Sequence, residues 1–171
     1  MHYCLREAHV SSVRRLCCRF ELFGDYEPYI IWSKNKRKEN VKMAGYVGPI
    51  EKQTLDNEYF RQVLFTGKNA QLVVMSLKPG EEIGNEVHKN VDQFFRIEQG
   101  EATFVFNGKE KHVVKDGDAV IVPAGTYHNV INSSKTTKLK LYTIYSPPNH
   151  PDKTVHKTKA EADKAEAEEH H

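Results

Sequence analysis

Eight short apolar or alternating runs, spaced about ten residues apart, fill positions 60–146 of this chain. They read RQVLFT, QLVVMSL, DQFFRIE, ATFVF, KHVV, AVIVP, HNVIN and LKLYTIY. The turns between them are rich in Gly, Asn, Asp and Pro. Asn107-Gly108 is a strong hairpin signal, because both central positions of a type I′ turn need positive φ. Strands this short and this regular predict an all-β sandwich or small barrel rather than a helical or βαβ fold.

Length and charge narrow the class of protein further. A chain of 171 residues is long enough for one domain with a sizeable core. Its formal net charge of +2 gives no argument for binding nucleic acid or a membrane surface. It has no run of about eighteen apolar residues, so we expect no transmembrane helix. Cys4, Cys17 and Cys18 lie outside the strand region, so we expect no disulfide framework there and a cytoplasmic location.

The two ends of the chain differ from its middle. We expect an irregular N-terminal extension over residues 1–43, a β domain over 44–150 and a polar tail over 151–171. The first twenty residues are rich in Arg and carry one acid, Glu7. They resemble an organelle transit peptide, and the alternative is an upstream start ahead of Met43. The tail contains mainly Ala, Glu and Lys without an apolar face, which predicts a frayed helix or no regular structure.

Strand alternation brings several polar residues together. Residues two apart in an extended strand face the same side, so Glu86 and His88 point the same way. By the same rule Gln93 shares its face with Phe95 and Ile97. We therefore expect a small polar site inside an apolar cup. The expected polar members are Glu86, His88, Gln93 and His128, and the expected pocket wall contains Phe95, Ile97, Val130 and Tyr142.

Two spaced patterns connect these residues to a known family. The first is Gly80-x5-Glu86-x-His88-x4-Gln93-x6-Gly100, and the second is Gly117-x5-Pro123-x-Gly125-x2-His128-x3-Asn132. Together they resemble the two motifs of the cupin superfamily, and GDAVIVPAGTYHNVIN matches the second motif at every position. The resemblance covers about residues 60–146 and implies a cupin double-stranded β-helix, which is a jelly-roll barrel. In the first motif, the family usually has His, His and Glu where this chain has Glu86, His88 and Gln93.

Carried over to this chain, the resemblance implies a metal site. Its ligands would be Glu86, His88, Gln93 and His128, and its ion a divalent transition metal such as Zn, Mn, Fe or Ni. A single carboxylate leaves the site with a net charge near +1, which favours an anionic or enolate-like ligand. A carboxamide is a weaker donor than a carboxylate, so Gln93 can instead orient a bound water or substrate. A cupin with these altered ligands can also bind no metal, which leaves Glu86 and Gln93 as a polar pocket floor.

Within the superfamily, the chain resembles small cupins of the mannose-6-phosphate isomerase-like type. This implies a homodimer and a metal-dependent isomerase of a small sugar or sugar phosphate, with Glu86 as the catalytic carboxylate. A phosphate site would need a pair of inward-facing Arg or Lys residues, and the pattern contains no convincing pair. Strand alternation places Arg96 on the face opposite Gln93. The alternatives are an Fe or Mn cupin dioxygenase and a non-catalytic cup that binds a small molecule such as a sugar.

The segment after the last strand bears on the mouth of the cup. His150 and His156 lie in SPPNHPDKTVHKTK, which can fold over the mouth as a lid. Tyr142 or Tyr145 reaches the pocket, depending on the register of the last strand. His112 belongs to an outer hairpin strand, where we expect it to be solvated.

Overall fold

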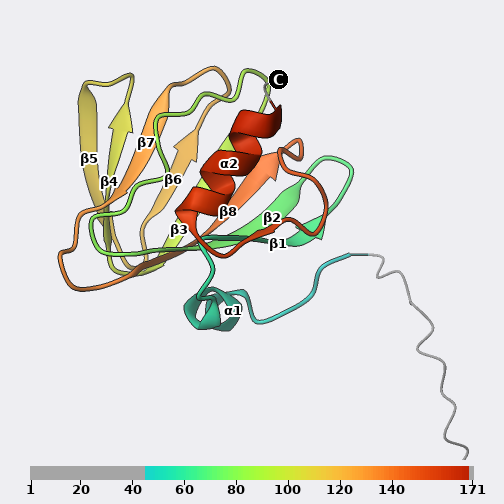
Figure 1. Cartoon of the computed structure of the whole chain (residues 1–171), viewed down its shortest axis with the longest axis horizontal. Helices are drawn as coiled ribbons and strands as arrows, with labels where there is room; N and C mark the ends of the chain where they lie inside the picture. The colour runs from blue at the N-terminus through green and yellow to red at the C-terminus, as the bar shows by residue number, and fades with distance from the viewer. Residues whose placement is uncertain (1–44, 170–171) are drawn as a thin grey trace, which may run out of the picture. The chain divides into compact units, whose positions relative to one another are not determined.

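The computed structural model describes residues 45–169 (Figure 1). The elements are α1 (Ile50–Asp56), β1 (Arg61–Thr66), β2 (Gln71–Leu77), β3 (Asp92–Gln99), β4 (Glu101–Phe106), β5 (Glu110–Lys115), β6 (Ala119–Val122), β7 (His128–Asn132), β8 (Leu139–Ser146), β9 (Val155–His156) and α2 (Lys159–Glu169). Strands β1 to β8 match the eight expected runs. The possible transit peptide or upstream start over residues 1–43 and the three cysteines lie outside the described residues.

The strands form two antiparallel sheets, as the all-β prediction requires (Figure 1). One sheet has six strands in the order β6-β3-β8-β2-β1-β9, and the other has three in the order β5-β4-β7. Side chains of the two inner faces meet in the core, where the rings of Phe95 and Phe104 pack edge to face at 5.1 Å. The prediction of a cupin double-stranded β-helix is therefore confirmed.

Local sequence explains the turn between β4 and β5. Asn107 and Gly108 both have positive φ, 49° and 69°, as a type I′ hairpin requires. Strand β5 is the outer strand of its sheet and is largely exposed. His112 on this strand is exposed and lies 2.6 Å from the carboxylate of Glu110, as expected for a solvated residue.

Asn132, the last residue of the second motif, holds the ends of three segments together. It is 1% exposed. Its Nδ2 donates to the backbone carbonyls of Leu77, Lys78 and Thr137 at 3.1, 2.9 and 3.0 Å. Its Oδ1 accepts a bond from the backbone N–H of Ser134 at 3.0 Å. The sequence pattern marked this residue, and the structure gives it a structural role.

We expect Asn132→Leu to lower the free energy of unfolding by at least about 2 kcal/mol, because buried carbonyls lose their donor. Urea unfolding of the variant and the parent protein measures this. Asn129→Leu is the matched control. Asn129 accepts one part-buried bond from the N–H of Gly84 and donates an exposed bond to Glu82, so we expect less than half the loss. Equal losses in the two variants would contradict the structural role.

The C-terminal segment is part of the fold. Strand β9 pairs with β1, with Arg61 opposite His156. Of the two alternatives expected for the tail, a frayed helix or no regular structure, the described residues form the helix α2. It packs on the barrel through Ala162, which is 1% exposed and belongs to the core. No helix in residues 45–169 is long and apolar enough to cross a membrane.

Candidate metal centre

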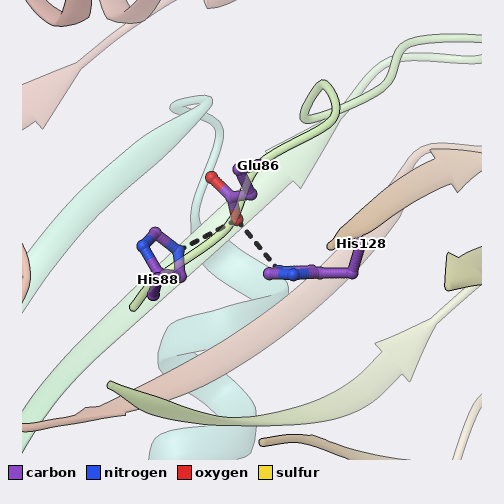
Figure 2. Close-up of side chains that lie close together, drawn as sticks. All are labelled: Glu86, His88 and His128. Carbon is purple, nitrogen blue, oxygen red and sulfur yellow. Dashed lines mark ion pairs between the residues drawn. The ribbon is translucent and has the colours of Figure 1, made fainter. Parts of the chain in front are cut away.

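Backbone pairing places the first two polar residues of the site. Glu86 and His128 form an antiparallel bridge and exchange both N–H···O bonds at 2.9 Å. Residues directly opposite each other in such a pair project to the same side. His88 follows Glu86 by two positions, and its carbonyl accepts a bond from the N–H of Gly125 at 2.8 Å. The three side chains therefore converge, as Figure 2 shows.

The spacing of their donor atoms suits a metal ion. The Oε1 atom of Glu86 lies 3.4 Å from Nε2 of His88 and 3.2 Å from Nε2 of His128. One donor atom from each residue lies within 4.8 Å of the others. Metal–ligand distances of about 2.0–2.2 Å, with angles of about 90–110°, separate neighbouring ligand atoms by roughly 2.9–3.5 Å. The two short distances agree with this separation.

Gln93 faces the same centre. It is 0% exposed, and its Nε2 donates to the hydroxyl of Thr143 at 3.2 Å. This bond directs the amide oxygen inward, where Oε1 lies 3.1 Å from Nε2 of His128. The structure thus places all four expected polar residues at one point, and the role of Gln93 as a ligand remains a prediction.

The nitrogen and oxygen atoms that face one another at the centre can bind a cation. Nδ1 of His128 lies 3.2 Å from the carbonyl oxygen of Thr126. In the tautomer that donates its ring proton there, Nε2 carries a lone pair that can bind a proton or a metal ion. Nε2 then faces two more acceptors, the inward oxygens of Glu86 and Gln93. The inward atoms of Glu86 and His88 are buried and have no hydrogen-bond partner, and a metal ion supplies the partner that such atoms lack.

The charge state of Glu86 agrees with this site. Burial alone would raise the pKa of its carboxyl group. Without a metal, imidazole nitrogens of His128 and His88 that face the carboxylate with a proton donate to it and attract it, which outweighs burial and holds the pKa of Glu86 well below its usual range. A bound cation takes the place of those protons. The carboxylate is therefore ionised at neutral pH, as a metal ligand must be. The residues present fit a divalent transition metal, whose identity the donor set leaves open.

A cavity of about 430 Å³ opens beside the centre, and much of its lining is polar. Its lining residues are Glu86, Val87, His88, Lys89, Asn90, Val91, Asn149, His150 and Glu166. On the apolar side, the ring of Phe95 lies 6.0 Å from that of His128. Ile97 and Val130, expected in the pocket wall, are fully buried in the core and are not among the residues that line the cavity.

The register of β8 decides which tyrosine reaches the site. Tyr145 is paired with Gln93 of β3, is 1% exposed and has its ring 5.6 Å from that of His88. Tyr142 is paired with Arg96, and its ring contacts Phe94 at 6.1 Å. Because alternate residues face opposite sides, the structure places Tyr145 at the metal centre and Tyr142 on the other face of the sheet. The pocket position expected for Tyr142 is thus taken by Tyr145.

His150 lines the cavity beside the site, and the lid role expected for it stays a prediction. Its ring packs edge to face on Tyr145 at 5.0 Å. Burial, followed by the positive charge of Arg61, lowers the pKa of His150 to about 3, so it is neutral at pH 7. His156 instead belongs to β9 and lies opposite Arg61.

The sequence analysis did not predict two charged residues that pair near the pocket. Arg61 is 1% exposed and pairs with Glu166 of α2 at 2.8 Å. The sequence does carry a weak signal for Arg61, since it lies two positions before the buried Val63 and so shares its inward face. Glu166 has no such signal, because the tail is rich in similar glutamates.

Two antiparallel sheets around a two-histidine, one-carboxylate cluster define a β-barrel protein with an internal metal site. A family model described as "Cupin domain" matches residues 73–145. The chain belongs to the cupin superfamily, as its two motifs predicted, and it is a metal-binding cupin by the character of its site.

Several relatives are similar over most of the β domain. The uncharacterized protein YrkC of Bacillus subtilis is 52% identical over 71% of this chain and 67% of its own. The uncharacterized protein L612 of Acanthamoeba polyphaga mimivirus is 50% identical over 62% of this chain and 68% of its own. The crystal structure of BH2720 from Bacillus halodurans is 44% identical, with a TM-score of 0.68, and is matched over 70% of this chain and 93% of its own.

Proposed function

We propose that this protein is a metal-dependent enzyme that isomerises a small sugar or sugar phosphate. The convergence of Glu86, His88 and His128 beside a polar cavity of about 430 Å³ carries the proposal. A cavity of this size encloses a small molecule. Its amide, imidazole and charged groups suit a ligand rich in hydroxyls.

The chemistry divides between the ion and the chain. A bound divalent metal polarises neighbouring substrate oxygens and stabilises negative charge that develops on them. The Oε1 atom of Glu86 faces both imidazoles, and its second carboxylate oxygen points away from them (Figure 2). In this proposal Glu86 acts either as a metal ligand through Oε1 or as the base that moves the proton between adjacent carbons. Tyr145 and His150 exclude water from one side.

The same three candidate ligands also support a second possible function. Two histidines and one carboxylate with open positions are typical of non-haem Fe(II) oxygenases. In that case the protein is a cupin dioxygenase, and the ion is iron or manganese. The third interpretation is a cup that binds a sugar without turnover, and this binding requires no metal.

Metal content and turnover distinguish the three candidates. The metal-free protein is reloaded with Zn, Mn, Fe(II) or Ni and assayed by NMR for interconversion of mannose and fructose and of their 6-phosphates. Oxygen uptake is followed in parallel. We expect metal-dependent isomerisation, and we expect Glu86→Gln to lower turnover by at least about 100-fold. Glu110→Gln, on the exposed strand β5, is the control.

Each other outcome points elsewhere. Oxygen uptake with Fe or Mn supports the dioxygenase. Sugar binding that needs no metal and survives Glu86→Gln without turnover supports the binding cup and contradicts catalysis. The homodimer and the cytoplasmic location remain predictions.

A further inference from the structure

A buried arginine close to the metal centre has unused binding capacity. The guanidinium of Arg61 makes one ion pair within the described chain, from Nη1 to Oε1 of Glu166 at 2.8 Å. Its Nε is buried and has no hydrogen-bond partner. A guanidinium presents five N–H donors in a planar fork that matches the two oxygens of a carboxylate. The Arg61 guanidinium therefore has N–H groups that can donate to a second anion or to one that replaces Glu166.

Arg61 lies within electrostatic reach of the metal centre. Burial acts to lower the pKa of the guanidinium, but Tyr145, Glu166 and Glu86 together raise it above its ordinary value. Glu166 itself lines the same cavity as Glu86 and His88. The carboxylate that Arg61 holds is thus in the space that a substrate would enter.

The helix that supplies this carboxylate is lightly attached. Glu166 is 47% exposed at its side chain, whereas Arg61 is 1% exposed. Ala162 lies in the core, and Lys159 Nζ contacts the carbonyl of Ile83 at 3.3 Å and lies over the ring of Phe60 at 6.0 Å. Most other described side chains of α2 are solvent-facing. A helix of this length has little stability of its own and depends on such contacts. Withdrawal of Glu166 from Arg61 is therefore a small rearrangement.

We propose that Arg61 binds the carboxylate of an acidic substrate at the metal centre, and that Glu166 occupies Arg61 until this substrate displaces it. The inference rests on the proposed function and narrows its substrate to a sugar acid or a similar small hydroxy acid. The occupant seen in the structure is a carboxylate. Arg61 does not itself line the cavity, so a substrate carboxylate reaches it where Glu166 now lies. Lys89 lines the cavity as an exposed residue, and a single buried cation suits a monoanion better than a dianionic phosphate.

Calorimetric titration of the metal-loaded full chain tests this with three probes, D-glucuronate, D-glucose and glucose 6-phosphate. Glu166→Gln keeps the length of the side chain and removes the competing charge. We expect it to bind glucuronate about tenfold more tightly than the parent protein, since one charge-assisted contact is released for the probe. Glucose affinity should stay within about twofold. Glu168→Gln, two residues along the same helix and paired with Lys164 at 3.8 Å, should behave like the parent.

Arg61→Lys provides the reverse test, because lysine keeps the charge and loses the planar fork. We expect it to weaken glucuronate binding about tenfold and to leave glucose binding unchanged. Thermal unfolding confirms that each variant is folded. If the ion pair only attaches α2 to the barrel, Glu166→Gln lowers the melting temperature without any gain in affinity, and the proposal is overturned.

Further outcomes also decide the matter. Absence of glucuronate binding in all variants, an equal gain in Glu168→Gln, or a gain restricted to glucose 6-phosphate overturns the proposal. Repeating the titrations on metal-free protein separates the two proposals. Metal-dependent turnover with no effect of Glu166→Gln leaves the proposed function standing, whereas a gain in carboxylate affinity in a protein without turnover leaves only the role of Arg61.

Discussion

His128→Ala is expected to weaken metal binding by at least about 100-fold, a loss at the upper end of what is seen when a group supporting a metal ligand is removed. His128 supplies one of three converging donors, and at 1% exposure its place cannot be filled by a neighbouring surface group. After dialysis against metal-free buffer, the parent protein should retain about one equivalent of a first-row divalent metal, and the variant almost none. Elemental analysis by mass spectrometry measures the difference.

The control for this experiment is His112→Ala. His112 is the exposed histidine on β5, so its removal should leave the metal content unchanged. Glu86→Ala/His128→Ala, which removes two of the three donors, should hold no metal even after reconstitution. Equal metal content in His128→Ala and His112→Ala would place the ion somewhere other than the proposed centre.

Phe104→Ala is expected to lower the free energy of unfolding by about 3–5 kcal/mol. Phe104 is 0% exposed, and its ring packs on Phe95 across the space between the two sheets. Alanine leaves a cavity that the strands cannot close without losing their pairing. The variant therefore loses the free energy of burying the ring and also bears the full free-energy cost of the cavity. Urea unfolding, followed by the far-ultraviolet circular dichroism of the backbone, measures the loss.

Ile121→Ala on β6 is the matched control. Ile121 is 67% exposed, so its replacement should change stability by no more than about 0.5 kcal/mol. A similar loss in both variants would show that the contact between the sheets is not the main source of stability. Because the ring of Phe95 contacts the rings of both Phe104 and His128, Phe104→Ala should also loosen the packing around the metal centre.

Much of the fold could be read from local patterns. Strand β3 alternates inward and outward residues, and its Gln93, Phe95 and Ile97 are all fully buried, as parity predicts. The hairpin at Asn107-Gly108 depends on two backbone angles that these residues favour. The spacing of Glu86, His88 and His128 was enough to expect a common site, because motif spacing and strand parity together determine the side to which a residue points.

Other features depend on which strands and segments meet. Parity alone separates Tyr142 from Tyr145, but only the register of β8 against β3 shows that the odd-numbered set faces inward. The position of His150 depends on how the chain after β8 folds back, and the pairing of Arg61 with Glu166 joins residues 105 positions apart.

The sequence by itself determined the all-β class, the two motifs and the residues that can bind a metal, since these follow from periods and spacings within short stretches of chain. Only the tertiary structure decided that Tyr145 packs on His88, that His150 lines the cavity beside the centre, and that a glutamate of the tail pairs with a buried arginine. The physical reason is that a polar tail carries no period that marks its docking site. Its place is set by a few contacts with a barrel that must already be formed.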